Sequence, residues 1–276
     1  MSKLKIHPFF WLVLASGVFT GHFYEVLMVF SIVFVHEMGH VGAAVFFRWK
    51  IEQVELLPFG GVAKTDEHGN RPLFEETIVI LAGPAQHLLL SGLAYFFYRT
   101  SFFDTGDFRT FMLYNLTLLF FNLLPVLPLD GGRLLRVVCY ACFPYRTAID
   151  HSLLISSALL TGLFIWSFYF YPTHLNLWVV LVFLAFSHYR EWKQRRFIYM
   201  RFLLARYYDK TSRSLRLQPI VVGKDTRISD VLEKFRRGVT HQVIVRHCEA
   251  RHVYEETDLL YAFFVEKKVV DPIGEL

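Results

Sequence analysis

The sequence is poor in charge and in cysteine. Asp, Glu, Lys and Arg together make up 19% of its 276 residues, whereas a typical soluble domain is about a quarter charged. Three cysteines are too few for a disulfide-rich scaffold. Cys139 and Cys142 form a C-x-x-C pair, but the two further ligands of a closed structural zinc site are missing from it. We therefore expect ordinary packing for this pair.

Long apolar runs take the place of charge. Hydrophobic residues make up 54% of the chain and aromatic residues 17%. Six stretches approach the ~20 apolar residues that a helix needs to cross a bilayer, namely 6–21, 23–47, 73–98, 110–128, 152–171 and 175–189. No small-x-small cleavage motif clearly follows the first, so we interpret it as a retained span rather than a signal peptide. The predicted fold class is an α-helical polytopic membrane protein with a small C-terminal α/β domain.

The basic residues are distributed unevenly between the loops. The net charge is +5, and Lys and Arg gather before the first span and after the second, fourth and sixth, at Lys3, Lys5, Arg48, Lys50, Lys64, Arg71, Arg133, Arg136, Arg146, Arg190, Lys193, Arg195 and Arg196. The positive-inside rule then predicts a multi-pass protein with both termini in the cytoplasm. Because the basic excess is explained by topology, we expect no direct contact with nucleic acid.

Three parts follow along the chain. Residues 1–189 hold the spans, and 190–214 are predicted to form a basic interfacial linker helix that contacts membrane lipid; a solvated linker helix is the equal alternative. Residues 215–276 are predicted to form a small α/β unit, with strands at 220–222 and 243–245 and helices at 228–235 and 257–264. Roughly 60 residues are marginal for independent stability, so pairing with a second copy, as a homo-oligomer, is expected.

The strongest chemical signal is the sequence His36-Glu37-Met38-Gly39-His40. Residues four apart lie on one face of a helix, so His36 and His40 can offer two imidazole nitrogens to one metal ion, with Glu37 beside them as a general base. The motif lies inside the second apolar stretch, where each ionisable group is costly. The alternative is a soluble core helix with a satisfied polar cluster.

A catalytic zinc ion usually has three protein ligands, so a third must come from elsewhere. Asp130 is the best candidate, because prolines and glycines interrupt the apolar run around it in Asn122-Leu-Leu-Pro-Val-Leu-Pro-Leu-Asp-Gly-Gly132. Irregular backbone at membrane depth is tolerated only where it lines protein or a wet cavity. The alternative is an Asp-Gly turn at a helix end.

These motifs together resemble the site-2 protease family of intramembrane zinc metalloproteases, closest to its sporulation members from endospore-forming bacteria. Further matching segments are Leu57–Gly61, His68–Pro72 and Ala82–His87. The resemblance implies that His36, His40 and Asp130 bind zinc and that Glu37 is the catalytic acid and base. It also implies that Asn122 and Pro128 help to place the substrate near the metal.

Two further segments invite interpretation. The stretch Leu57–Val62, with Phe59, Gly60 and Gly61, is expected to bind extended substrate by strand addition; a structural turn is the equal alternative. His87 lies next to Gln86 in an apolar span, either near the site or, as we favour, in a bond to a neighbouring helix. His68 and the helix-start residues Glu75 and Glu76 are expected to serve local structure.

The C-terminal part resembles a CBS domain in the stretches Pro219–Val222, Asp225–Phe235 and Tyr254–Leu260. Asp258 matches the ribose-contacting acid of nucleotide-binding members, which suggests ATP as a ligand. Glu255 stands where those members usually have Thr, and this departure weakens the expectation. Only one CBS motif is visible, and such motifs work in pairs, which again indicates a homo-oligomer.

The resemblance implies a membrane-associated substrate, the precursor of sigma-K (pro-sigma-K), processed on the mother-cell side of the outer forespore membrane. It also implies inhibitory membrane partners of the BofA and SpoIVFA type. Two other classes of function remain: a CBS-gated metal or ion transporter whose histidines bind cargo, and an inactive membrane scaffold. Transport should survive Glu37→Gln, whereas proteolysis should cease, and stoichiometric zinc would count against a scaffold.

Overall fold

Helices rich in apolar residues make up most of the structure, which is a computed structural model describing residues 3–6, 21, 23–49, 51–57, 60–65, 71–208, 216–247 and 250–276. The helices are α2 (Phe23–Phe46), α3 (Leu73–Arg99), α4 (Thr105–Asn122), α5 (Asp130–Cys142), α6 (Tyr145–Phe170), α7 (Leu175–Tyr208), α8 (Ile228–Leu232) and α9 (Glu256–Phe264), with a short 3-10 helix, η1 (Ile273–Glu275). The strands are β1 (Lys3–Ile6), β2 (Ile51–Leu57), β3 (Gly60–Thr65), β4 (Leu217–Gly223), β5 (Thr240–His247) and β6 (Ala250–Glu255).

Three of the described helices, α2, α3 and α6, are long and apolar enough to cross a membrane. They coincide with the predicted spans 23–47, 73–98 and 152–171, although α6 begins earlier, at Tyr145. The predicted span 110–128 corresponds to α4 and the break that follows it, and 175–189 is the first half of α7. Almost all of the predicted span 6–21 lies outside the described residues. The chain is therefore a membrane protein with at least three candidate spans.

The chain divides into two compact units. The first consists of Met1–Glu67, Phe74–Pro125 and Leu129–Leu134, and the second of His68–Leu73, Val126–Pro128 and Leu135–Leu276. Helices α2, α3 and α4, strands β1 to β3 and the first turn of α5 belong to the first unit. The remainder of α5, together with α6, α7 and the C-terminal elements, belongs to the second.

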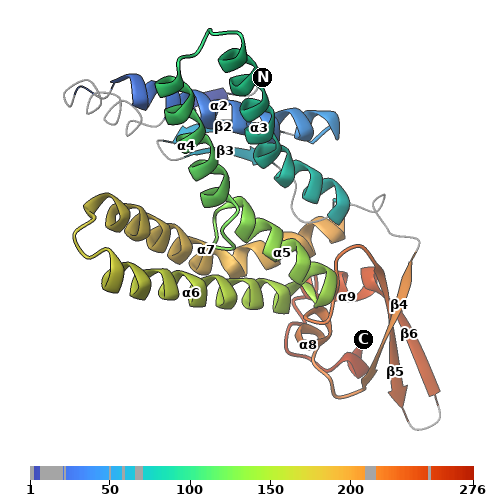
Figure 1. Cartoon of the computed structure of the whole chain (residues 1–276). Helices are drawn as coiled ribbons and strands as arrows, with labels where there is room; N and C mark the ends of the chain where they lie inside the picture. Colours follow the sequence, from blue (N-terminus) through green and yellow to red (C-terminus); the bar gives the residue numbers. More distant parts are fainter. Residues whose placement is uncertain are drawn as a thin grey trace. The chain divides into compact units, whose positions relative to one another are not determined.

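In the first unit, a three-stranded sheet accompanies the helices. β2 lies in the middle, parallel to β1 and antiparallel to β3. Leu57 pairs with Gly60 and Leu56 with Gly61, so β2 and β3 are paired within the stretch Leu57–Val62 that was expected to bind substrate or to form a structural turn. β3 lies beside α2, the helix that carries the His-Glu motif (Figure 1).

The turn between α4 and α5 requires glycine. A Cβ on Gly131 would overlap the carbonyl oxygen of Leu123, the residue that caps α4. Only glycine therefore allows the end of α4 and the start of α5 to approach so closely. Gly131 itself lies in the first turn of α5, so this glycine serves close helix packing, and the break in the chain lies before it, between Asn122 and Asp130.

The second unit has one continuous apolar core. α6 and α7 run side by side as an antiparallel pair (Figure 1). Tyr145 of α6 stacks on Phe202 of α7, with ring centroids 3.8 Å apart, and the same cluster of buried residues includes Phe235, Leu259 and Leu260 of the C-terminal region. The C-terminal elements thus share one core with the long helices, since α9 contacts both α7 and the sheet strands β5 and β6, and this relieves the marginal stability expected of about 60 residues.

The C-terminal elements follow the order β-α-β-β-α. β4 pairs in parallel with β5, and β5 pairs antiparallel with β6. Both predicted strands and both predicted helices are present, but β6 was missed, and the first predicted helix ends at Leu232 rather than Phe235. The part of the predicted linker 190–214 that the structure describes, up to Tyr208, is helical as predicted, and it continues the helix α7 that begins at Leu175.

Candidate metal centre

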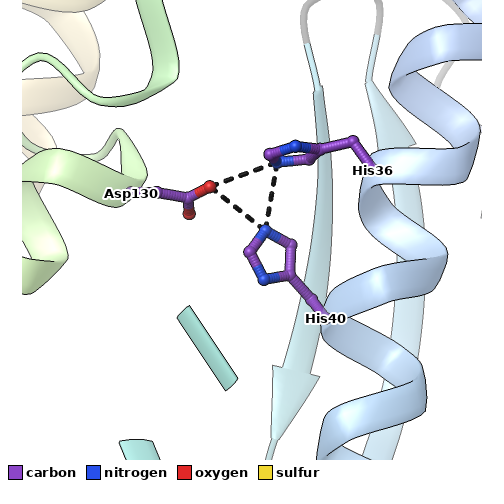
Figure 2. A group of neighbouring side chains, drawn as sticks. All are labelled: His36, His40 and Asp130. Carbon is purple, nitrogen blue, oxygen red and sulfur yellow. Dashed lines mark hydrogen bonds and ion pairs between the residues drawn. The ribbon is translucent and has the colours of Figure 1, made fainter. Parts of the chain in front are cut away.

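Two histidines on one face of α2 form the first half of the site. His36 and His40 are separated by one helical turn, and both side chains are buried. Their Nε2 atoms lie 3.1 Å apart. Two imidazole nitrogens inside an apolar helix are thus directed at the same point (Figure 2).

The first turn of α5 supplies a carboxylate to the same point. Oδ2 of Asp130 lies 3.1 Å from Nε2 of His36 and 3.1 Å from Nε2 of His40, as Figure 2 shows. Its other oxygen, Oδ1, lies 3.8 Å from the guanidinium of Arg133, one turn further along α5. The break after α4 therefore brings residues 90 positions apart into contact.

The donor set and its geometry suit zinc. The three atoms form a triangle with sides of 3.1 Å, close to the roughly 3.3 Å expected between ligands of a tetrahedral ion with bonds of about 2.0–2.1 Å. Two nitrogens and one carboxylate oxygen also leave a fourth position open, as in catalytic zinc sites. All three residues are buried, and a cation between them would offset the cost of burying the carboxylate.

Helix α3 closes the site from a second side. The carbonyl oxygen of Val79 lies 2.8 Å from Nδ1 of His40. A carbonyl can only accept, so Nδ1 of His40 donates its proton, and the Nε2 lone pair is left facing Asp130. Gly83, one turn after Val79, faces both rings, and a Cβ there would overlap the ring of His40. Glycine at this position is what allows α3 to approach the histidines.

His87 and Asn115 extend the site beyond the three candidate ligands. Nε2 of His87 lies 3.0 Å from Nδ1 of His36, and Nδ1 of His87 lies 2.7 Å from Oδ1 of Asn115 on α4. Sequence reasoning favoured a bond from His87 to a neighbouring helix. The structure gives both that bond and a contact with the site. Asn115 was missed; its only signal was an amide in an apolar helix.

Comparison with known proteins identifies the family. The model of peptidase family M50 matches residues 24–104 and 105–163. Stage IV sporulation protein FB of Bacillus subtilis (strain 168) is 40% identical over 275 residues, which cover 99% of this chain and 96% of that protein. The chain belongs to peptidase family M50.

Other relatives cover less of the chain. A zinc metalloprotease of Methanocaldococcus jannaschii is 36% identical over 124 residues, or 43% of this chain and 35% of that protein. The solved structure of a site-2 protease from the same organism superposes with a TM-score of 0.55 at 28% identity, covering 68% of this chain and 89% of that one. The M50 chain described here is therefore an intramembrane zinc metalloendopeptidase of the site-2 protease type.

The remaining residues predicted for this M50 site lie in several places. Glu37 is buried on α2, directly after His36. Asn122 is the half-buried last residue of α4, and Pro128 precedes α5 by two residues. Gly60 and Gly61 begin β3.

Four residues singled out from the sequence lie elsewhere or outside the described part of the chain. Phe59 and His68 are outside the described residues. Asp258 is exposed at the start of α9, where its carboxylate accepts the backbone N–H of Glu255 at 3.0 Å. Glu75 accepts a hydrogen bond from the indole of Trp49 in the first turn of α3, in keeping with the structural role expected for it.

Proposed function

We propose that His36, His40 and Asp130 hold the zinc ion of this M50 peptidase and that Glu37 is its general base and acid. The observation that carries the proposal is the 3.1 Å triangle of Nε2, Nε2 and Oδ2 atoms, buried beside a glutamate on a membrane helix. An isolated carboxylate and two imidazoles would be costly at membrane depth. Because the three groups converge on one point, a bound cation would compensate for this cost.

Each residue then has a defined task. Zinc, when bound, would lower the pKa of a coordinated water towards ~7 and polarise the scissile carbonyl. Glu37 takes the proton of the attacking water and passes it to the leaving nitrogen. His36, His40 and Asp130 keep their geometry through fixed partners, including the Val79 carbonyl and the Arg133 guanidinium. Asn122 and Pro128, which flank the turn before Asp130, position the substrate segment.

The edge of the sheet is our proposed binding site for the scissile segment. A helical substrate hides its carbonyls in its own hydrogen bonds, so it must be extended to be cut. Within the described residues, the order β1-β2-β3 leaves the outer edge of β3 without a strand partner, and β3 lies beside α2. Strand addition there, beginning at Gly60 and Gly61, would hold substrate in the required conformation, and we propose that Phe59, which precedes them in the sequence, contributes to binding.

The substrate we propose is the membrane-associated precursor of a sporulation transcription factor, of the pro-sigma-K kind. What supports this is 40% identity to a stage IV sporulation protein over almost the whole of both chains. The same relationship supports inhibitory membrane partners of the BofA and SpoIVFA type and a location in the outer forespore membrane. We propose six spans with cytoplasmic termini, since the basic loops alternate with neutral ones.

We propose that residues 215–276 form a CBS-type regulatory unit that works as part of a homo-oligomer and binds ATP. Support comes from the β-α-β-β-α order of the elements and from the exposed carboxylate of Asp258 at the N-terminus of α9. Glu255 opposes it, because its negative charge caps the same helix end. Glu255→Thr should therefore strengthen ATP binding while keeping a good N-cap residue, and Asp258→Asn should weaken it.

Co-expression with candidate precursors tests the function. Glu37→Gln should abolish the shortened product, because an amide accepts no proton, while zinc content stays near one per chain. Glu25→Gln is the matched control: it lies on the same helix α2, where its carboxylate accepts a hydrogen bond from Tyr114 at 3.0 Å. Glu25→Gln should process normally. Undiminished cleavage by Glu37→Gln would refute the proposed roles, and a transporter would keep moving its cargo in that variant.

A further inference from the structure

A chain of hydrogen bonds runs from α4 through α3 to the candidate zinc ligand on α2. It begins at Asn115, passes through His87 and ends at His36, with successive distances of 2.7 Å and 3.0 Å. Asn115 and His87 are among the least exposed polar side chains described, at 0% and 1%. All three residues of this hydrogen-bonded series belong to the first unit.

The orientation of the Asn115 amide is fixed by its partners. Its Nδ2 lies 2.9 Å from the backbone carbonyl of His87 and 2.9 Å from Oγ of Ser91. The hydroxyl proton of Ser91 is already used on that same carbonyl, so Oγ can only accept from Asn115. The NH₂ group must therefore face these two acceptors, and the amide oxygen must face His87.

The protons on both imidazoles follow from that orientation. Nδ1 of His87 faces an oxygen that can only accept, so Nδ1 carries the proton and Nε2 of the neutral ring keeps its lone pair. That lone pair accepts from Nδ1–H of His36. His36 is then left with its Nε2 lone pair directed at Asp130 and His40, as metal binding requires.

We propose that His87 and Asn115 are positioning residues that fix the tautomer and ring orientation of His36 for zinc. The inference rests on the proposed metal site and deepens it. The tautomer of His40 is fixed in the same way by the backbone carbonyl of Val79, which a side-chain substitution does not remove. The tautomer of His36 depends on side chains of two other helices, so substitutions there should alter His36 and leave His40 unchanged.

The first test measures zinc affinity of the full-length protein in nanodiscs, by competition with a chelator. His87→Leu should weaken zinc binding by about 10–100-fold, the usual effect of losing a partner of a ligand histidine. Asn115→Leu should weaken it in the same direction. His87→Gln should restore most of the affinity, because the glutamine amide oxygen can accept from Nδ1–H of His36.

A matched control separates positioning from helix packing. His188 on α7 is a buried histidine that bonds Ser156 and Ser157 of α6, at 3.3 Å and 2.7 Å. His188→Leu removes interhelical hydrogen bonds of the same kind without touching the ligands. It should lower thermal stability and leave zinc affinity unchanged. Equal zinc affinity in native, His87→Leu and Asn115→Leu proteins would overturn the proposal.

The second test reads the tautomer directly. Solid-state ¹⁵N NMR of the metal-free protein labelled at histidine should show the Nδ1–H form for His36 and His87 in the native chain and for His36 in His87→Gln. An Nε2–H tautomer at His36 in the native protein would disprove the role of His87 and Asn115 even if a variant failed to fold. Absence of zinc from the native protein would refute the metal site. If the native protein binds zinc and the variants bind it with the same affinity, only the role of His87 and Asn115 would be refuted.

Discussion

Two buried histidine networks, one in each unit, invite comparison. In the first unit, His36 and His40 direct their Nε2 lone pairs at Oδ2 of Asp130, and the guanidinium of Arg133 lies 3.8 Å from the other carboxylate oxygen, Oδ1. In the second unit, His241 and Glu256 share a salt bridge network with Arg206. Both clusters are buried and join elements far apart in sequence. They differ in their hydrogen bonds, because the second pairs each donor with an acceptor, whereas the first brings acceptor atoms together.

The second network is closed. Arg206 donates to Glu256 at 2.7 Å and to the carbonyls of Arg236 and Val239. Glu256 also accepts the backbone N–H of His241, and Nε2 of His241 accepts the N–H of Arg236. Every strong group has a partner within the chain, so this cluster stabilises structure. The first network instead leaves acceptors facing one another, which is the arrangement that a metal ion completes.

The largest effect should come from breaking the open network at its carboxylate. Asp130→Asn replaces an anionic ligand by a neutral amide, and we expect zinc affinity to fall about a hundredfold or more, since roughly 10–16 kcal/mol of zinc binding is shared among few ligands. Proteolysis should be lost with it. Metal analysis of purified protein checks this, and an Asp130→Asn protein that retains tightly bound zinc would contradict the ligand assignment.

Breaking the closed network should damage stability and leave the metal alone. Arg206→Leu strands the buried carboxylate of Glu256 and two carbonyls, at a cost of about 3–5 kcal/mol. Hydrogen exchange across β5 and α9 should report local opening, while zinc content stays native. The double variant with Glu256→Leu should recover part of the loss, because no unpaired charge remains. A double variant less stable than Arg206→Leu would show that the pair is not coupled as described.

Alanine substitutions at two glycines of α3, Gly83 and Gly92, should differ in their effect on zinc binding. Gly83→Ala forces the ring of His40 to move, and overpacking of this kind costs about 1–3 kcal/mol, so zinc affinity should fall by about fivefold or more. Gly92→Ala, on the same helix, meets nothing within 4 Å and should be neutral for zinc binding and cleavage. If both variants bind zinc equally well, the close approach of α3 to the histidines is wrong.

The smallest expected effect is a pH dependence confined to the closed network. Burial lowers the pKa of His241 from its ordinary 6.5. Burial alone would raise the pKa of Glu256, but the hydrogen bond from His241 and the charge of Arg206 outweigh it, and the pKa lies below 4.5. For both groups the unfolded chain binds more protons, so stability rises with pH.

The stabilisation by His241 should therefore be complete above pH 6.5 and decline as the pH falls below that value, and the contribution of Glu256 should decline below 4.5. Hydrogen exchange of β5 between pH 5 and 8 measures the first part. His241→Gln keeps an acceptor for the Arg236 N–H and does not titrate, so its profile should be flatter. A native profile that is flat over this range would remove the assigned role of the neutral imidazole.

The sequence was most informative where one helix supplies the geometry. Spacing alone put His36 and His40 on one face, and the Pro-Gly break predicted that Asp130 is available as a partner. Asn115 and Gly83 were beyond reach because their roles depend on which helices touch: an isolated amide or glycine in an apolar run has many explanations. β6 was missed because its alternation is weak and charged residues interrupt it, although pairing with β5 makes it a strand.

Boundaries were lost where composition changes but conformation does not. The apolar stretch 175–189 and the basic segment 190–214 differ sharply in polarity, and the prediction separated them into a span and a linker. Neither contains proline or glycine, the residues that most strongly break a helix, and the backbone continues as α7 to Tyr208. A change in polarity along a sequence indicates that the surroundings of the helix change. It does not indicate that the helix ends, because the backbone hydrogen bonds can continue through it.

That continuity has a mechanical consequence. At 1.5 Å per residue, the 34 residues of α7 span about 50 Å, well beyond the ~30 Å of a hydrocarbon layer. The helix contains neither proline nor glycine, the usual points of bending. Phe202 and Leu203, near its far end, lie in the same buried cluster as Leu259 and Leu260 of α9, the helix that contacts β5 and β6 of the C-terminal sheet. A movement of the C-terminal sheet and α9 would therefore be transmitted along the whole length of α7 with little bending of the helix.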